Sequence, residues 1–204
     1  MTECPDRQFY SRPTAAVARD LVGMKLVRTL ESGAANLRIA GIIVETEAYG
    51  HTNDGASHAR IGATKRNSVM FGAVGRAYVY FAYGNHYCVN VSARSREVNA
   101  GAVLIRALEP VEGIEIMRKL RHNENVLSLA SGPGKLTQAL NITGSCNGVD
   151  MTDPDTDLHI EYGSTPRQII ATQRIGIARG TAKKWRFLDP TTSYVSKKAQ
   201  IKVR

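Results

Sequence analysis

The chain has 204 residues, enough for one sizeable core and too few for two ordinary domains, so we expect a single domain over residues 1–204. Hydrophobic residues make up 43% and charged residues 22%, and no stretch approaches the ~20 apolar residues of a membrane span, which excludes disordered and membrane-spanning classes. Lys and Arg number 27 against 18 Asp and Glu, and the net charge of +9 is typical of a surface for a polyanion such as nucleic acid, or serves solubility alone.

Capping residues and β-forming runs predict the first elements. Ser11 can cap a helix that has Pro13 in its first turn and ends at Gly23. Residues 24–30 and 37–49 are rich in β-forming side chains and flank a turn-prone segment. This pattern predicts a hairpin.

A second hairpin is the clearest in the sequence, because residues 76–83 and 86–93 flank Gly84 and Asn85, a loop that a primed turn prefers. The later predicted elements are a strand over 102–108, a basic helix over 111–121, a helix from Ser131 and Pro133 through Leu140, strands over 158–162 and 168–177, and an edge strand or basic tail over 193–204. About seven strands then follow one another through short turns. We therefore expect an α+β fold with a curved, largely antiparallel sheet, flanking helices and a protruding hairpin.

Cysteine use and the N-terminus indicate the compartment. Cys4, Cys88 and Cys146 lie far apart without a C-x-x-C pair, so neither a disulfide framework nor a zinc knuckle is predicted. Residues 1–13 lack the apolar core of a secretory signal. We expect a cytoplasmic protein.

Two carboxylates and a tyrosine share one face at the end of the second predicted strand. Side chains alternate along a strand, so Glu45, Glu47 and Tyr49 point the same way, and a loop then leads to His58. Ionisable groups at a strand exit are favoured catalytic positions, whereas two Glu at alternate positions also suit a solvated strand face. Both interpretations are open on these residues alone.

Four tyrosines cluster in the second hairpin and are flanked by arginines. Rings interleaved with Arg suit base stacking and phosphate contact, although a tyrosine-rich sheet core is favoured for Tyr78 and Tyr87. Tyr83 directly precedes the turn, so its ring should project from the hairpin tip. A wedge inserted between base steps would explain an exposed ring there.

Several familiar motifs are excluded by inspection. Residues 132–136 contain Gly-Lys but lack the upstream Gly and the following Ser or Thr of a phosphate loop. Ser131 and Lys135 near that helix start can still hold a backbone phosphate, or the helix is simply capped. Residues 122–124 match the H-x-E of zinc deaminases without the required Pro-Cys-x-x-Cys, and the 5 His are too scattered for a metal site.

A set of motifs occurs in order along most of the chain. They are Val44-Glu45-Thr46-Glu47-Ala48-Tyr49, Arg66-Asn67 before Met70-Phe71, Tyr78-Val79-Tyr80, Tyr83-Gly84, Asn90, Leu104-Ile105-Arg106-Ala107-Leu108-Glu109-Pro110, Ser131-Gly132-Pro133 and Arg174-Ile175-Gly176-Ile177. The set closely resembles the alkyladenine (3-methyladenine) DNA glycosylases of the mammalian type. Two departures are His86, where the mammalian members carry an aromatic residue, and a loop between His58 and Arg66 that is one residue shorter.

The resemblance implies roles for the matching residues. Glu47 would be the general base that activates the water attacking C1′, and Arg106 and the backbone carbonyl of Ile175 would hold that water. The flipped base would lie between Tyr49 on one side and His58 with Tyr80 on the other. Tyr83 would be the wedge that fills the gap in the duplex. Asn90 would screen the purine edge against guanine, and Leu104 would line the pocket.

The chemistry of the residues agrees with these roles. Hydrolysis of an N-glycosidic bond passes through an oxocarbenium-like sugar, so one Glu can stabilise the charge and deprotonate water, and Arg106 would keep it ionised despite burial. An alkylated purine is cationic, and aromatic walls favour such rings. The motif set holds no lysine for a Schiff base, so we expect a monofunctional enzyme that leaves an abasic site without metal or cofactor.

The expected partner is double-stranded DNA containing damaged purines, which the protein binds as a monomer, and no membrane partner is expected. A protein of this kind would be associated with the nucleoid in a bacterium or lie in the nucleus of a eukaryote. The main alternative is a non-catalytic binder of damaged duplex DNA, which would tolerate Glu47→Gln, whereas a glycosylase needs Glu47 and Arg106. A third alternative, a hydrolase of free nucleosides, would need neither Tyr83 at a hairpin tip nor the charge of +9.

Overall fold

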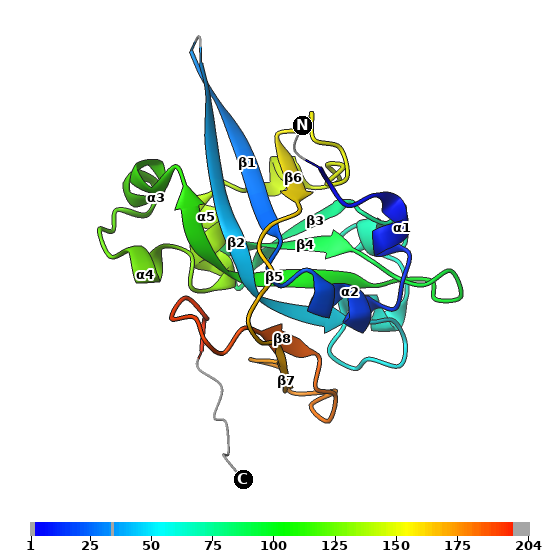
Figure 1. Cartoon of the computed structure of the whole chain (residues 1–204). Coiled ribbons are helices and arrows are strands. Elements are labelled where there is room, and N and C mark those ends of the chain that lie inside the picture. Colours follow the sequence, from blue (N-terminus) through cyan, green and yellow to red (C-terminus); the bar gives the residue numbers. More distant parts are fainter. Residues whose placement is uncertain (1–2, 34, 198–204) are drawn as a thin grey trace.

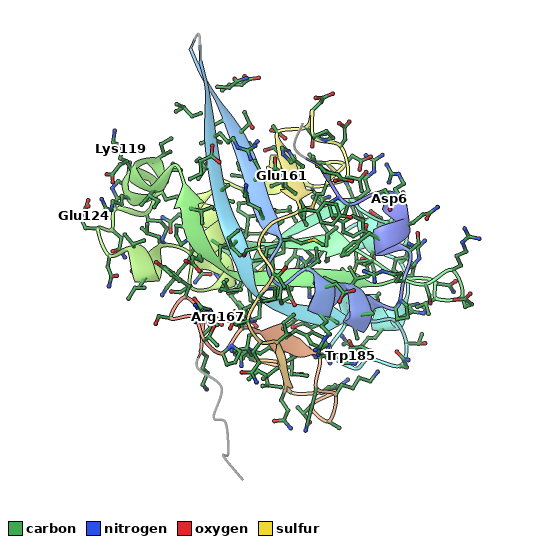
Figure 2. The ribbon with its side chains drawn as sticks, in the orientation of Figure 1. Asp6, Lys119, Glu124, Glu161, Arg167 and Trp185 are labelled. Atoms are coloured by element: carbon green, nitrogen blue, oxygen red, sulfur yellow. The ribbon has the colours of Figure 1, made fainter. Side chains whose placement is uncertain are left out.

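The structure is a computed structural model that describes residues 3–33 and 35–197 (Figure 1; the same view with side chains in Figure 2). Its strands are β1 (Lys25–Ser32), β2 (Ala35–Tyr49), β3 (Ala77–Ala82), β4 (His86–Ser92), β5 (Ala102–Glu112), β6 (Leu158–Glu161), β7 (Ile170–Thr172) and β8 (Arg186–Leu188). Its helices are α1 (Arg7–Tyr10), α2 (Thr14–Asp20), α3 (Ile114–Arg121), α4 (Val126–Leu129) and α5 (Pro133–Ala139), with short 3-10 turns at His58–Ile61, Ser68–Met70 and Gly144–Cys146.

The described strands form one eight-stranded sheet. Its order is β3-β4-β5-β2-β1-β6, with β8 paired to β2 and β7 paired to β8, and each of these pairs is antiparallel. The sheet curls, a few short helices flank it, and the β1–β2 hairpin projects from the body (Figure 1). The predicted α+β fold with a largely antiparallel sheet is confirmed. In the described ranges, no helix is long and apolar enough to cross a membrane.

The long strand β2 carries the acidic stretch through the interior of the sheet. Its residues Glu45–Glu47 pair with β5 on one side and with β8 on the other. Helix α2 covers one face, where the Thr46 hydroxyl donates to the Ala18 carbonyl at 2.6 Å. Glu45 and Glu47 lie on the opposite face and are fully buried. The interpretation of this stretch as a solvated strand face is therefore wrong.

A bulge interrupts β2 beside these carboxylates. The register against β5 shifts between Ile43 and Glu45 and again between Glu45 and Thr46. Such bulges bend a strand and re-aim its side chains, and they are frequent beside active sites. The alternation that the sequence suggests survives the bulge, because Glu45 and Glu47 still meet the same partner, Arg106.

The first predicted helix is divided into two. Ser11 ends α1 rather than capping the next helix, and its hydroxyl donates to the Arg7 carbonyl at 3.0 Å. Pro13 precedes α2 in an extended conformation, so Thr14 is the first helical residue. Proline fixes its own φ and disfavours a helical residue before it, which explains the break. Helix α2 ends at Asp20, ahead of Gly23.

The two predicted hairpins are confirmed, with different turns. Pairing of β1 with β2 continues to Ser32 and Ala35, so the connection is shorter than the sequence suggests. In the second hairpin Ala82 pairs with His86, and the Asn85 N–H donates to the Ala82 carbonyl at 3.2 Å. The central turn residues are therefore Tyr83 and Gly84, both with positive φ, rather than Gly84 and Asn85.

Several later boundaries also differ from the prediction. Residues 111 and 112 extend β5, and the helix starts only after Gly113, whose φ of 69° ends the strand. Of residues 168–177 only Ile170–Thr172 form a strand, because the following residues turn toward the cleft described below. Strand β8 and helix α4 were not predicted. Residues 193–197 form no strand, and 198–204 lie outside the described residues.

Candidate active site

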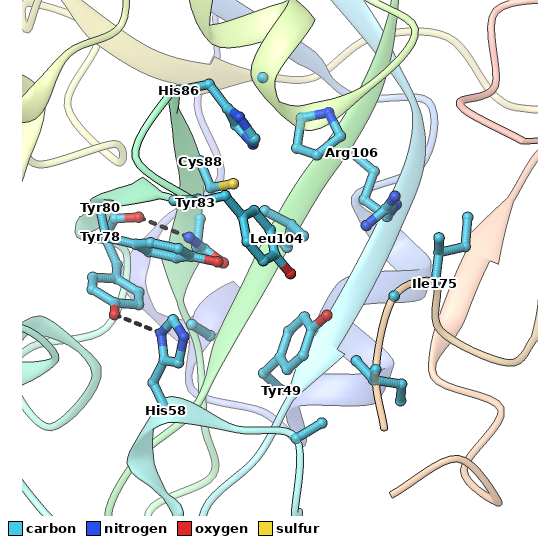
Figure 3. A pocket seen from close by; sticks show the side chains of 18 of the residues that line it. Tyr49, His58, Tyr78, Tyr80, Tyr83, His86, Cys88, Leu104, Arg106 and Ile175 are labelled. Atoms are coloured by element: carbon cyan, nitrogen blue, oxygen red, sulfur yellow. Dashed lines mark hydrogen bonds between the residues drawn. The ribbon is translucent and has the colours of Figure 1, made fainter. Parts of the chain in front are cut away.

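A large cleft opens beside the β3–β4–β5 end of the sheet (Figure 3). Its volume of ≈ 1020 Å³ is at the upper end of the range for ligand pockets. The predicted site residues that line it are Tyr49, His58, Tyr80, Tyr83, Asn90, Leu104, Arg106, Lys135 and Ile175. Glu47 is not part of the lining, because it lies directly behind Tyr49 and Arg106. Ser131 is outside the lining as well.

Glu47 accepts three hydrogen bonds in its buried position. The Tyr49 hydroxyl donates to Oε2 at 2.7 Å, and Nη1 of Arg106 donates to the same oxygen at 3.2 Å. The backbone N–H of Ile175 donates to Oε1 at 2.7 Å. The resemblance implied a role for the Ile175 carbonyl, whereas the group that contacts Glu47 is the Ile175 amide. A carboxylate has about four acceptor positions, so these three donors leave one of them unused.

Burial dominates the acidity of Glu47. Removal from water raises the pKa of its carboxyl above the ordinary value, and the charge of Glu45 adds to this effect. The charge of Arg106 and the donors Ile175 and Tyr49 lower the pKa without cancelling the rise. Arg106 thus opposes the effect of burial, as expected, but does not outweigh it. A carboxylate whose pKa is raised is a stronger base, which suits proton abstraction.

Arg106 bridges two buried carboxylates. It lies on β5, and its Nε donates to Oε1 of Glu45 at 3.1 Å while its Nη1 reaches Glu47. Arg186 of β8 donates from Nε to the same Glu45 oxygen at 2.7 Å. Two carboxylates are therefore balanced by two guanidinium groups, which is the arrangement that keeps buried charges tolerable. Arg186 was missed in the sequence because the three-residue strand β8 carries no periodic signal.

One wall of the cleft is built from His58, Tyr78 and Tyr80. His58 begins a 3-10 turn capped by Ser57, and its Nδ1 lies 2.9 Å from the Tyr78 hydroxyl. Its ring meets that of Tyr80 at a centroid distance of 4.7 Å. Burial, with repulsion from nearby arginines, lowers the pKa of His58, which favours the neutral imidazole. Tyr78 itself is buried, which confirms the core position predicted for it.

Tyr49 forms the opposite wall and is supported from behind. Figure 3 shows Tyr49 across an open space from His58 and Tyr80. The Arg174 guanidinium lies 4.7 Å from the centroid of the Tyr49 ring. Arg174 is held by Asp54 at 2.6 Å in an ion pair whose two side chains are fully buried, and it also donates to the Ala48 carbonyl. Sequence reasoning gave no role to this pair.

Asn90, Leu104 and Cys88 lie on adjacent strands within the cleft. All three are almost fully buried, and Leu104 packs with Cys88 in one apolar cluster. The Asn90 side-chain amide donates to the Tyr78 carbonyl at 2.9 Å, across the hairpin. This bond fixes the orientation of the Asn90 side chain at the cleft surface. Cys88 was not predicted as a site residue.

Tyr83 occupies the tip of the second hairpin. Its φ of 50° is unusual for a residue with a side chain, and 88% of its surface is exposed. An exposed aromatic ring in a strained turn is not explained by packing, since it contributes little to the core. The prediction that Tyr83 projects from the hairpin tip is confirmed, and its ring stands at the mouth of the cleft.

Ser131 and Lys135 lie at the start of α5, next to the same hairpin. Ser131 does not cap the helix; Gly132 occupies that position. Nζ of the exposed Lys135 donates to the Ser131 hydroxyl at 3.4 Å. Gly134 is pressed against the His86 ring, which brings α5 and the hairpin into close contact. Phosphate binding by Ser131 and Lys135 stays a prediction.

Metal ligation was not expected. Among residues 3–33 and 35–197, no three or more His, Cys, Asp and Glu side chains are grouped so as to hold a metal ion.

The arrangement of a buried acid, a bridging guanidinium and aromatic walls is suited to acid–base chemistry on a flat ring system.

Comparisons with known proteins point to one family. The family described as methylpurine-DNA glycosylase matches residues 8–193. A protein of Methanocella arvoryzae that is provisionally named 3-methyladenine DNA glycosylase is 47% identical over 201 residues, covering 95% of this chain and 96% of its own length. A relative of the same name in Carboxydothermus hydrogenoformans is 49% identical, covering 94% and 98%. A third in Rhodopseudomonas palustris is 46% identical, covering 94% and 87%. The prediction that the chain is of the mammalian type is not tested by these relatives and stays a prediction.

Proposed function

The chain belongs to the methylpurine-DNA glycosylase family, and on this premise we propose that it removes alkylated or deaminated purines from double-stranded DNA. The observation that carries the proposal is the buried Glu47, held directly behind the wall of an aromatic cleft by Arg106, Tyr49 and Ile175, which line it. The names of the relatives support 3-methyladenine as one substrate. The match over 8–193 supports one glycosylase domain for the chain.

The damaged base is flipped out of the duplex into the cleft. It lies between Tyr49 on one side and His58 with Tyr80 on the other, where aromatic faces attract an electron-poor ring. Arg174 behind Tyr49 and the Tyr78 hydroxyl beside His58 keep both walls in place. The neutral His58 avoids repelling the cationic base.

Glu47 then activates a water molecule held by Arg106 and the Ile175 carbonyl. The carboxylate takes a proton from the water as its oxygen attacks C1′ of the sugar, and the C1′–N bond breaks with its electron pair leaving on the purine. A cationic alkylated purine becomes neutral by accepting this pair, which makes it a good leaving group. The negative charge of Glu47 stabilises the oxocarbenium-like sugar. The product is an abasic site in an intact strand.

The exposed residues around the cleft bind the duplex. Tyr83 fills the gap that the flipped nucleotide leaves, as apolar wedges do in bent DNA. Asn90 screens the purine edge against guanine, and Leu104 lines the pocket beside it. Lys135 with Ser131 contacts a backbone phosphate. We propose that the protein acts on DNA as a monomer. Its place in the cell is then the compartment that contains the genomic DNA.

The test is excision from duplex oligonucleotides that contain one hypoxanthine or one ethenoadenine, and from methylated DNA, in the presence of a metal chelator. The proposal predicts abasic sites that become strand breaks only after alkali. Breaks without alkali would show a lyase. Binding to damaged duplex without any base release would favour a non-catalytic damage-binding protein.

A further inference from the structure

A segment near the end of the described chain reaches the charged cluster behind the cleft. Ser196 follows β8, and its backbone N–H donates to Oε2 of Glu45 at 2.6 Å while its hydroxyl donates to Oε1 at 2.8 Å. Nη2 of Arg186 donates to the backbone oxygen of Lys197. Val195 is buried in an apolar cluster with Val44 and others. The residues before and after Ser196 are therefore also held against the sheet.

These contacts saturate Glu45 and set the direction of Arg106. Oε1 of Glu45 accepts from Nε of Arg106 at 3.1 Å, from Nε of Arg186 at 2.7 Å and from the Ser196 hydroxyl. A guanidinium is rigid and planar, so fixing its Nε on Glu45 determines where its terminal nitrogens point. One of them meets Oε2 of Glu47 at 3.2 Å.

We propose that Glu45, held by Ser196, is a positioning residue that holds Arg106 against Glu47, an inference that rests on the proposed function. Neither Glu45 nor Ser196 lines the cleft, so neither contacts a bound base. Ser196 also lies beyond residue 193, where the match to the family ends. Its part in the site follows from the contacts of this chain alone.

The charged and titratable groups around Glu47 show why the position of Arg106 matters. They come from strands β2, β4, β5 and β8 and from the loop after β7, and they are Glu45, Tyr49, Cys88, Arg106, Arg186 and Arg174. Arg106 is the cation that donates directly to Glu47 and also lines the cleft. A displacement of Arg106 therefore changes both the general base and the site of the water.

The experiment measures the single-turnover excision rate constant and, separately, the dissociation constant for the same duplex. The probe is a duplex with one hypoxanthine or one ethenoadenine, whichever the wild type excises faster. Glu45→Gln should lower the rate constant about tenfold or more and Ser196→Ala about threefold, with little change in DNA binding. Ser193→Ala, at an exposed serine three residues away, should match the wild type.

Repeating both substitutions in an Arg106→Ala background shows whether Glu45 acts through Arg106. The proposal predicts that neither then causes a further loss, because the group being positioned is gone. Equal losses in both backgrounds, or wild-type rates for Glu45→Gln and Ser196→Ala, would overturn it. If Glu45→Gln fails to fold by circular dichroism, Ser196→Ala makes the same test, since only one hydroxyl is removed.

The results that would refute the proposed function differ from those that would refute the positioning role. A wild-type protein that excises no lesion refutes the glycosylase proposal itself. A wild type that is active and loses activity on Glu47→Gln, combined with additive losses in the cycle, refutes only the positioning role.

Discussion

The Tyr49→Phe substitution isolates one contact that sets the proton affinity of Glu47. It keeps the ring in front of Arg174 and removes only the hydroxyl that donates to Glu47 at 2.7 Å. A hydrogen bond to a charged group contributes about 1.5–3 kcal/mol, and part of it persists when the carboxyl is protonated. A difference of about 1.4 kcal/mol between the two protonation states corresponds to about one pKa unit.

The sign of the effect follows from the proposed role of Glu47 as a base. Excision needs the carboxylate form, so activity is lost as the pH falls through the pKa of Glu47. Because burial already raises that pKa, the acid limb of the wild-type profile should lie above the ordinary range for a glutamate. Loss of the Tyr49 hydroxyl should move the acid limb of the pH–rate profile to higher pH by about one pH unit. The rate constant on the plateau should stay within a few fold of the wild-type value.

The assay is the single-turnover excision rate constant as a function of pH, for the wild type and Tyr49→Phe. Tyr162→Phe serves as the control, since Tyr162 is 51% exposed and lies away from the cleft. Its profile should coincide with that of the wild type. An acid limb at the same pH in all three proteins would refute the idea that the limb reports Glu47 tuned by Tyr49.

Three further substitutions test the wedge, the screen and the support of the cleft. Tyr83→Ala should reduce excision from duplex far more than from single strands, because the wedge offsets an unstacking cost of roughly a few kcal/mol; equal losses would contradict the wedge. Asn90→Ser should admit guanine-type bases, and unchanged selectivity on methylated DNA would limit Asn90 to its bond with the Tyr78 carbonyl. Asp54→Asn should lower Tm by about 10 °C, because leaving the buried Arg174 unpaired costs about 3–5 kcal/mol, and an unchanged Tm would show that the pair adds no stability.

The parts of the site that the sequence predicted correctly are governed by local rules. Alternation along one strand places Glu47 and Tyr49 on a common face, and the structure joins them by a hydrogen bond. A Gly-Asn pair after an aromatic residue indicates a tight turn, so Tyr83 was expected at a hairpin tip. The turn itself shifted by one residue because Tyr83 adopts positive φ, a conformation that the sequence rule assigns to Gly or Asn.

The parts that were missed depend on contacts between distant residues. Arg174 and Asp54 are 120 residues apart, and Ser196 is 151 residues from Glu45. No periodicity or spacing rule connects such positions. Strands of three residues, such as β8, are too short for alternation to be visible, and yet β8 supplies Arg186 to the buried charge cluster. The burial of Glu45 and Glu47 likewise depends on residues far along the chain, because Arg186 and Ser196 contact Glu45 and Ile175 contacts Glu47.

The most direct test of Glu47 as the general base is the effect of Glu47→Gln on base release. The variant keeps the size of the side chain and removes the ability to take a proton from water. If Glu47 is the base, Glu47→Gln should bind a lesion-containing duplex normally and lose excision by a factor of about a hundred or more. Glu124→Gln, at an exposed glutamate, should retain wild-type excision. Excision by Glu47→Gln at the wild-type rate would show that Glu47 is not the base and would refute the proposed mechanism.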